Sequence, residues 1–247
     1  MVPKVPIHAL GRRWAIATVA ATAVFWTCDD GERPSVPVRA AEGEVAAPAA
    51  ALDVVLFLGT SLTAGQGVAP EDAYPAVVQR KIDAAGLDFR VVNAGVRGES
   101  SAGGLRRLDW LLRQRVDVLV VELGANDGLR GQDIDAMRRN LQEIIDRTRA
   151  AYPATDIVIA GMEAPPNLGS RYTGRFRNVF RDLARKNDAV LIPFLLQGVA
   201  AEEDLNQLDG IHPNADGHKI MAETVWRVLE QVLGRRTDGQ MDGGAGR

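Results

Sequence analysis

The chain has 247 residues, of which 46% are hydrophobic and 25% are charged, and its formal net charge at pH 7 is -3. Such a composition is typical of a globular protein with one domain of ordinary size, and it excludes a disordered or fibrous chain. Basic and acidic residues are interspersed, so the sequence lacks the basic patch of a nucleic-acid-binding protein, and we expect a small-molecule partner instead.

Residues 1–28 have the pattern of a secretory signal sequence. Basic residues precede an uncharged stretch at residues 14–27, which has the length of a signal's apolar core and is short for a membrane span. We therefore expect an exported protein, located in the periplasm or anchored to a membrane. Cys28, which two aspartates follow, resembles the lipidated cysteine of a bacterial lipoprotein and would then be a membrane tether. The alternatives are a leader cut at a nearby alanine and an uncut anchor.

Two segments beside the folded part show no hydrophobic pattern. Residues 29–51 are rich in proline, alanine and glutamate, which predicts a flexible linker. Residues 235–247 are rich in glycine and charge, which predicts a disordered tail. The domain expected to fold is therefore residues 52–234. Cys28 is the single cysteine, so neither an intrachain disulfide nor a cluster of metal-binding thiolates is expected.

Strand-like apolar runs alternate with helical patterns between residues 52 and 234. The runs that predict strands are residues 54–58, 91–92, 116–121, 157–160 and 189–192. Apolar residues at helical spacing predict helices over residues 74–82, 105–112, 137–148, 176–183 and 221–232. Strict alternation of the two elements predicts an α/β fold, in which helices cover both faces of a parallel sheet.

The loops that follow the strands of a parallel sheet meet at one edge of the sheet, where ligands bind in open α/β folds. In this chain these loops hold Ser61 and residues 93–98, 124–127, 162–172 and 194–213. We expect the functional site among them. The long loops at residues 162–172 and 195–208 are expected to form the walls of its pocket.

Ser61 follows the first apolar run directly, in the sequence GTSL at residues 59–62. The run is short, begins with β-branched residues and is closed by a glycine, which is typical of a buried parallel strand. A hydroxyl at the carboxyl end of such a strand is a candidate nucleophile if a base can reach it. The alternative interpretation is that Ser61 caps the next helix.

Histidine is scarce, and this limits the candidates for the base. The three histidines are His8 in the leader, His212, and His218 in the closing helix. Asp209 precedes His212 by three residues, and a glycine and a proline in this stretch enforce a turn. A carboxylate so placed can accept a hydrogen bond from one imidazole nitrogen and leave the other to take the serine proton. The alternative is an ordinary loop that enters a helix.

Acyl transfer also needs hydrogen-bond donors for the oxygen that becomes negative, and backbone N–H groups and amide side chains usually supply them. Asn126 follows the third apolar run and Gly98 follows the second, so both belong to the expected sheet edge. Asn126 could instead be a turn residue, and Gly98 could simply supply a positive φ.

Four sequence blocks, in this order along the chain, resemble the motif blocks of the SGNH (GDSL) hydrolases. They are GTSL at residues 59–62, NAGVRG at 93–98, ELGANDGLRG at 122–131 and DGIHPN at 209–214. The resemblance covers residues 52–234, and it is strongest to a bacterial periplasmic group with thioesterase, arylesterase and lysophospholipase activities.

This resemblance implies a three-layer α/β/α flavodoxin-like fold with a five-stranded parallel sheet. It implies Ser61 as the nucleophile, His212 as the base and Asp209 as the carboxylate that orients the base. The backbone N–H groups of Ser61 and Gly98 and the side chain of Asn126 would form the oxyanion hole. The implied reaction needs neither a metal nor an organic cofactor.

The chain departs from the family pattern in two places. The family usually has an aspartate before the nucleophile, whereas this chain has Thr60, whose hydroxyl can still bond to nearby backbone. The second block continues with Glu99 and Ser100, where relatives often have aspartate and threonine. Gly95 is a rival of Gly98 as a backbone donor, but Gly98 is the better match by its position in the block.

We therefore expect a serine esterase that hydrolyses aryl esters, acyl thioesters or lysophospholipids through an acyl-enzyme intermediate. A carbohydrate O-deacetylase on the same fold is the main alternative, and a non-catalytic lipid-binding surface lipoprotein is another. A nucleotide-binding protein fits less well, because residues 59–67 contain neither a phosphate-loop lysine nor a complete Gly-x-Gly-x-x-Gly motif.

Overall fold

The computed structural model describes residues 52–244, with side chains through Asp238. The predicted signal sequence, the candidate lipidation site at Cys28 and the predicted linker lie outside the described residues and stay predictions. Within residues 52–244, no helix combines the length and the apolar character that a membrane crossing needs.

The described part of the chain forms one parallel sheet with the spatial order β2-β1-β3-β4-β5. Its strands are β1 (Asp53–Gly59), β2 (Phe89–Gly95), β3 (Val118–Glu122), β4 (Asp156–Ala160) and β5 (Val190–Ile192). The α-helices are α1 (Ser61–Ala64), α2 (Tyr74–Ala84), α3 (Ser101–Leu111), α4 (Ala125–Leu129), α5 (Ile134–Ala151), α6 (Ser170–Lys186) and α7 (Ala215–Gly244). Short 3-10 turns, η1 (Pro70–Asp72), η2 (Pro166–Leu168) and η3 (Glu203–Leu205), lie in the loops.

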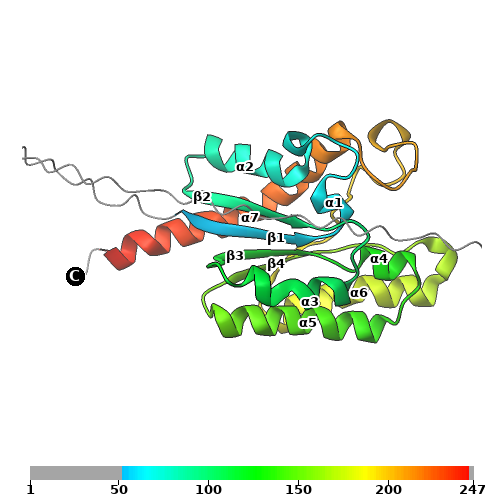
Figure 1. Ribbon diagram of the computed structural model, residues 1–247, viewed down its shortest axis with the longest axis horizontal. Coiled ribbons are helices and arrows are strands. Elements are labelled where there is room, and N and C mark those ends of the chain that lie inside the picture. The colour runs from blue at the N-terminus through cyan, green and yellow to red at the C-terminus, as the bar shows by residue number, and fades with distance from the viewer. Residues whose placement is uncertain (1–51, 245–247) are drawn as a thin grey trace, which may run out of the picture. The chain divides into compact units, whose positions relative to one another are not determined.

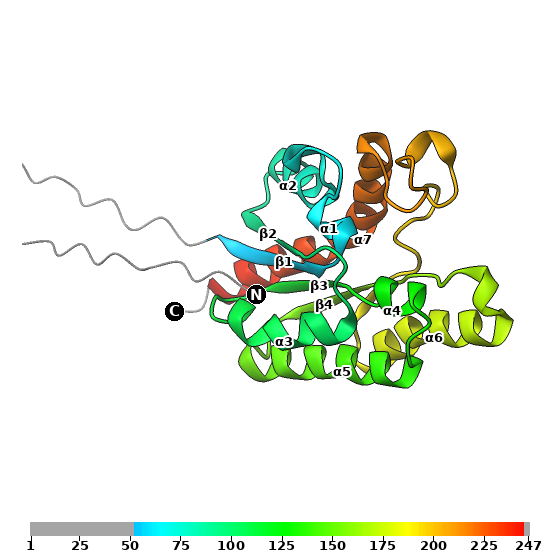
Figure 2. The same cartoon turned by 45° about the vertical axis from the view of Figure 1, so that its right-hand side comes forward.

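The sheet lies between two layers of helices (Figure 1). The helices α2 and α7 pack together over one face, while α3, α5 and α6 cover the other, as the turned view in Figure 2 also shows. Three layers with the strand order 2-1-3-4-5 are the flavodoxin-like form of a doubly wound α/β fold. The fold class expected from the sequence is therefore confirmed.

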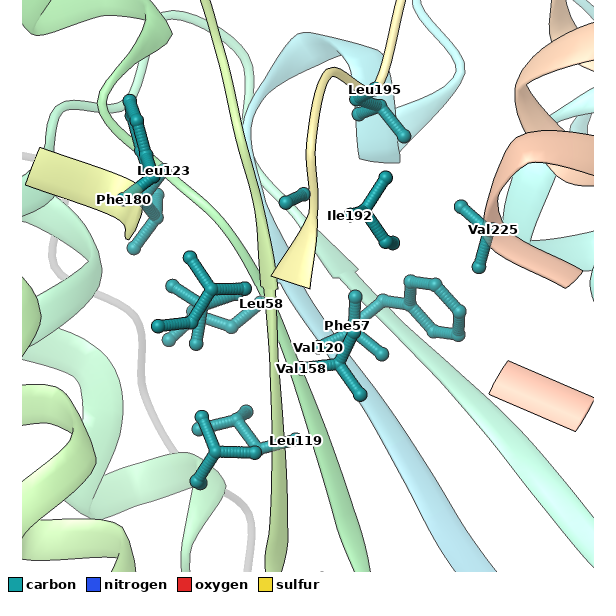
Figure 3. Close-up of a cluster of buried hydrophobic side chains, with 14 of the residues drawn as sticks. Phe57, Leu58, Leu119, Val120, Leu123, Val158, Phe180, Ile192, Leu195 and Val225 are labelled. Atoms are coloured by element: carbon teal, nitrogen blue, oxygen red, sulfur yellow. The ribbon is translucent and has the colours of Figure 1, made fainter. Parts of the chain in front are cut away.

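The apolar core occupies both faces of the sheet, because the central strands are buried on both sides. Phe57 of β1 and Val120 of β3 pair in register and point toward α7, where Val225 lies (Figure 3). The next residue of β1, Leu58, points to the opposite face, where Phe180 of α6 lies. All of these side chains are buried. The packed central strands give the loops at their carboxyl ends a rigid support.

The expected strands and helices are all present, and two short helices were not predicted. Among the strands, the largest change is in β2, which was predicted over residues 91–92 and spans Phe89–Gly95. The additional helices α1 and α4 contain four and five residues, too few to show a hydrophobic period. Both begin directly after a central strand, at the edge where the site was expected.

The closing helix is longer than the sequence predicted. We expected a disordered tail at residues 235–247, but α7 continues to Gly244. Arg236 explains why the helix continues past Gly234, because its guanidinium donates to Asp156 at 2.7 Å and to Asp117 at 3.3 Å. These partners lie 80 and 119 residues away along the chain, so the local composition did not reveal them.

Replacing Arg236 with alanine is expected to lower the free energy of unfolding by about 1–3 kcal/mol, because it removes a charged partner of a buried carboxylate. That carboxylate is Asp117, whose side chain is 2% exposed and which keeps its other partner, Arg115. Urea unfolding measures the change. The exposed neighbour Arg235 supplies the control, since Arg235→Ala should change stability by less than about 0.5 kcal/mol. Equal effects of the two substitutions would contradict the role given to Arg236.

Candidate active site

The central strands β1 and β3 are neighbours at the point where the winding of the sheet reverses. From β1 the chain crosses to β2 on one side, and β3, β4 and β5 follow on the other side. Such a switch point opens a crevice at the carboxyl ends of the two strands. Ser61 follows the end of β1 and Asn126 follows the end of β3, and both line one cavity at this crevice.

Ser61 is the first residue of α1, and it does not serve as the cap of that helix. Thr60 is the N-cap instead, with its side-chain oxygen accepting a hydrogen bond from the N–H of Leu62 at 3.4 Å. Gly65 ends the helix after one turn in a left-handed conformation, with φ of 69°. The hydroxyl of Ser61, a residue that is 9% exposed, is therefore available to the residues across the crevice.

The imidazole of His212 lies between Ser61 and Asp209. Its Nε2 atom is 3.0 Å from Ser61 Oγ, and its Nδ1 atom is 2.7 Å from Asp209 Oδ2. Ser61 and His212 are 151 residues apart, so the convergence of loops at the sheet edge brings them together. The three residues are arranged in the order serine, imidazole, carboxylate that the sequence led us to expect.

His218 lies apart from this arrangement, in the core. It is 1% exposed, and its Nδ1 atom accepts the backbone N–H of Tyr74 at 3.2 Å. Burial lowers the pKa of His218 to about 4, so the ring is neutral at pH 7. His212 is therefore the histidine at the site among the described residues.

The turn that carries His212 also holds Asp209 in place. Asp209 Oδ1 accepts the backbone N–H groups of Ile211 at 2.9 Å and of His212 at 3.0 Å, and Gly210 makes the turn with φ of 67°. The backbone N–H of His212 is the largest cause that keeps the pKa of Asp209 well below its usual range, followed by the His212 ring and the N–H of Ile211. Asp209 is consequently ionised near neutral pH.

Gln207 links the loop that carries His212 to the loop that follows α1. Its side-chain Nε2 donates to the carbonyl of Gln66 at 2.7 Å and to that of Pro213 at 2.9 Å. Its backbone N–H donates to the carbonyl of His212 at 2.7 Å. No motif pointed to Gln207, because a glutamine in a loop carries no local sign of a partner 141 residues earlier.

The candidate oxyanion-hole donors lie beside Ser61. Gly98 and Asn126 line the same cavity as Ser61. Asn126 Nδ2 donates one hydrogen bond to the carbonyl of Glu99 at 3.0 Å, which fixes the amide and leaves its second hydrogen for another acceptor. Gly98 has φ of 70°, a conformation that favours glycine.

Gly95, the rival donor, has a packing role. A Cβ atom at this position would lie 2.2 Å from the backbone nitrogen of Ala64, so a glycine is needed for β2 to approach α1 so closely. Gly98, in contrast, would have Arg130 as its nearest neighbour, at 3.7 Å from a Cβ atom. Among the described residues the cavity lining includes Gly98 and not Gly95, which favours Gly98 as the donor.

An ion pair that the sequence did not predict lies beneath the Gly98 loop. Arg107 Nε contacts the two carboxylate oxygens of Glu99 at 2.9 and 2.8 Å, and Arg107 Nη2 donates to the carbonyl of Ala94 at 2.6 Å. The pair ties the loop between β2 and α3 to the end of β2. Glu99, recognised in the sequence as a departure from the family pattern, thus helps to fix the loop that carries Gly98.

The cavity beside Ser61 has a volume of about 380 Å³ and a largely apolar wall. Its apolar lining residues are Leu62, Ala125, Leu129, Met162, Leu196 and Ile211. The two expected wall loops contribute Met162, Glu163 and Leu196, although the end of the first loop, from Ser170, belongs to α6. An apolar pocket with a few convergent polar groups suits the acyl part of an ester.

Two further features of residues 52–238 bear on the location of the site. A larger open groove of about 770 Å³ runs beside α6 and β5, but none of the three triad residues lines it. No group of three or more His, Cys, Asp or Glu side chains in this part of the chain is arranged to hold a metal ion. The crevice at Ser61 is thus where the chemically suited residues gather.

Comparison with known proteins matches residues 57–220 to the GDSL-like Lipase/Acylhydrolase family. The chain is 37% identical over 185 residues to Esterase TesA of Pseudomonas aeruginosa, which covers 74% of this chain and 91% of that protein. It is 36% identical over 186 residues to thioesterase 1/protease 1/lysophospholipase L1 of Escherichia coli (strain K12), covering 75% and 87% of the two. It is 32% identical over 190 residues to the arylesterase of Vibrio mimicus, covering 76% and 94%.

Solved structures show the same likeness. The crystal structure of TesA matches with a TM-score of 0.69 and 36% identity over 72% of this chain and 99% of that chain. The psychrotrophic esterase EstA from Pseudoalteromonas sp., solved as inhibited by monoethylphosphonate, matches with a TM-score of 0.69 and 33% identity over 74% and 99%. The family match includes every residue of the site described above, from Ser61 to His212.

Proposed function

The chain belongs to the GDSL-like lipase/acylhydrolase family and is an ester-hydrolysing enzyme, and from this membership we propose that Ser61, His212 and Asp209 form its catalytic triad. The observation that carries the proposal is the continuous hydrogen-bonded chain, with 3.0 Å from Ser61 Oγ to His212 Nε2 and 2.7 Å from His212 Nδ1 to Asp209 Oδ2. This is the geometry that activation of a serine requires.

In the proposed reaction, Ser61 Oγ attacks the carbonyl carbon of the ester while His212 Nε2 takes the hydroxyl proton. Asp209 holds the ring in the tautomer that leaves Nε2 unprotonated, and its charge stabilises the imidazolium that forms. His212 then gives the proton to the departing alcohol or thiol, and an acyl-enzyme remains. Water, deprotonated by His212, hydrolyses this acyl-enzyme and restores Ser61.

The negative oxygen of each tetrahedral intermediate needs donors that are in place before the reaction. We assign this role to the backbone N–H groups of Ser61 and Gly98 and to the side chain of Asn126. The bond from Asn126 to the Glu99 carbonyl and the Glu99–Arg107 ion pair support the assignment, because both hold the donors without help from the substrate.

Replacing Asn126 with alanine is expected to lower kcat for a p-nitrophenyl ester by about 10²–10³-fold, because one oxyanion donor is lost. KM should change far less, since the donor acts mainly on the negative oxygen of the intermediate. Steady-state rates over a range of ester concentrations separate the two constants. Asn167, an exposed asparagine of the 162–172 loop, gives the matched control Asn167→Ala. A parent-like kcat for Asn126→Ala would remove Asn126 from the oxyanion hole.

We propose aryl esters, acyl thioesters and lysophospholipids as the substrate classes. The apolar lining of the cavity supports an acyl group as the part of the substrate that is bound. The relatives named esterase, thioesterase/lysophospholipase and arylesterase support the same range of compounds. A carbohydrate O-deacetylase is the second candidate, because it would use the same triad on an acetyl ester.

A substrate panel tests this proposal. The purified protein is assayed with p-nitrophenyl acetate, butyrate and octanoate, with an acyl-CoA, with a lysophospholipid and with an acetylated sugar. Faster hydrolysis of butyrate or longer acyl groups than of the acetylated sugar supports the proposed range. A clear preference for the acetylated sugar favours the deacetylase. A folded protein that hydrolyses none of them favours a lipid-binding role.

A further inference from the structure

A buried carboxyl group, Glu122, lies directly beneath the turn that carries Ser61. Glu122 is the last residue of β3 and pairs in register with Gly59, the last residue of β1. Its exposed fraction is 0%. The proposed reaction gives Glu122 no task, and a buried acidic group calls for a physical explanation because an ionised carboxylate is costly to remove from water.

Glu122 accepts hydrogen bonds from residues on both sides of Ser61. Its Oε2 atom lies 2.8 Å from the backbone nitrogen of Thr60 and 2.8 Å from the hydroxyl of Thr63. The hydroxyl of Thr60 lies 3.0 Å from each carboxylate oxygen. One carboxyl group thus fixes the residue before the nucleophile and the third residue of the helix that the nucleophile begins.

The hydrogens of this network are fully accounted for when Glu122 is ionised. Tyr74 OH lies 2.7 Å from Thr63 Oγ1, so Tyr74 can donate to Thr63 while Thr63 donates to Glu122. Thr60 donates to Glu122 and accepts the N–H of Leu62. Each threonine hydroxyl then donates once and accepts once, and every donor that reaches the carboxyl group meets an acceptor.

Burial acts against this ionised form. It raises the pKa of Glu122 to about 7, although the hydrogen bonds from Thr60 and Thr63 act in the opposite direction. Tyr74 of α2 is the titratable group that faces Glu122 through Thr63, and burial, with a smaller effect of the Glu122 charge, raises its pKa well above the usual value. His218 of α7 packs on Tyr74 and is neutral at pH 7, so it adds no charge.

The approach of these groups depends on the residues beside the carboxyl group. A Cβ atom on Gly59 would lie 2.0 Å from Thr63 Oγ1 and 2.7 Å from Glu122 Oε2, so this strand end must be a glycine. Thr60 stands where the family usually has aspartate, and a threonine can donate to Glu122, which an ionised aspartate cannot. The local sequence is therefore matched to a carboxylate acceptor at position 122.

We propose that Glu122 is a positioning residue of the nucleophile, whose buried carboxylate holds Thr60 and α1 so that the Ser61 hydroxyl meets His212 Nε2. The inference rests on the proposed function, because it takes Ser61 as the nucleophile. It adds a positioning residue to the proposed catalytic machinery, since the Glu122 carboxylate acts through the turn that carries Ser61 and does not touch the substrate.

The test replaces Glu122 with glutamine, which keeps the shape but turns amide hydrogens toward the threonine donors. We expect kcat for p-nitrophenyl butyrate to fall by about 10- to 100-fold and KM to change by less than about threefold. The reason is that a small displacement of the nucleophile lowers the rate of the chemical step more than it lowers the affinity for substrate. Near-ultraviolet circular dichroism and urea unfolding of the full chain verify that the variant is folded at the assay temperature.

Asp117 provides a matched control at the opposite end of the same strand pair. It is also buried, at 2% exposed, and its carboxylate accepts the backbone N–H of Val54 at 2.9 Å, as Glu122 accepts that of Thr60. Asp117→Asn should lower stability and leave kcat within about twofold of the parent, because no site residue depends on it. An equal loss of kcat in both variants would show that general destabilisation causes the loss in Glu122→Gln, and it would overturn the inference.

The pH dependence gives a readout that a merely structural role would not change. Since Glu122 acts as a carboxylate, kcat of the parent should fall as the pH is lowered through about 7, in addition to any loss from protonation of the base. Thr63→Val removes a hydrogen bond that lowers the pKa of Glu122. The fall of kcat at low pH, the acid limb of the pH profile, should therefore move to higher pH by about 0.5 units or more.

This second variant keeps the inference testable if Glu122→Gln does not fold. An acid limb that stays in place in Thr63→Val, or a folded Glu122→Gln with parent-like kcat, would overturn the role of Glu122. A folded parent protein without esterase activity is a different result, because it contradicts the proposed function itself and the inference with it.

Discussion

Replacing Ser61 with alanine is expected to lower kcat for p-nitrophenyl esters by about 10⁴-fold or more, because no acyl-enzyme can form without the hydroxyl. The substitution removes one oxygen atom from a residue that is 9% exposed, and the cap of α1 is supplied by Thr60. The fold should therefore be retained, and the loss can be assigned to chemistry. Initial rates at saturating ester, with circular dichroism as the check of folding, measure it.

A phosphonate ester probe distinguishes loss of the nucleophile from a general loss of activity. The parent should gain one covalent adduct, which peptide mass spectrometry locates at Ser61, and Ser61→Ala should gain none. Ser170, an exposed serine at the start of α6, supplies the control, because Ser170→Ala should keep both the adduct and the parent rate within about twofold. Equal activity of the parent and Ser61→Ala would show that the nucleophile lies elsewhere.

The sequence predicted the candidate triad because each of its residues lies in a recognisable local sequence pattern. Ser61 follows a buried strand and a glycine, and Asp209 and His212 are three residues apart around a turn. The contact between Ser61 and His212 spans 151 residues, but it follows from topology, because loops after parallel strands meet at one edge. The local sequence and the strand alternation indicated which residues could meet, and the family resemblance implied their roles.

The supporting contacts could not be predicted in the same way. Glu122 reaches Thr60 across 62 residues, and Gln207 reaches Gln66 across 141. The sequence around a single acidic or amide residue does not indicate whether its side chain bonds to water or to a distant backbone group. The extension of α7 was missed for the same reason, because Arg236 is held by carboxylates far away in the sequence. The order of motifs and elements along the chain indicates the candidate triad residues, whereas the contacts that support them come from long-range packing.

Replacing Asp209 with asparagine is expected to lower kcat by about 10³–10⁴-fold, because the histidine is then held in the wrong tautomer. Asparagine can keep the loop, since its Oδ1 can still accept the N–H groups of Ile211 and His212 that Asp209 Oδ1 accepts at 2.9 and 3.0 Å. Its amide group, however, donates to His212 Nδ1. The ring proton must then sit on Nε2, which can no longer accept the proton of Ser61.

The expected profile of this variant separates the tautomer effect from loss of structure. The unfolding midpoint should stay close to that of the parent, KM should change little, and a higher pH should not restore the rate, because the fault is the position of a proton and not the charge of the ring. Asp204, an exposed acid on the same loop, gives the control Asp204→Asn, which removes one negative charge without touching His212 and should keep kcat within about twofold. If Asp209→Asn retained the parent kcat, the carboxylate would not orient the base. The His212 ring would then be oriented by its loop, which the bond from the Gln207 N–H to the His212 carbonyl helps to hold.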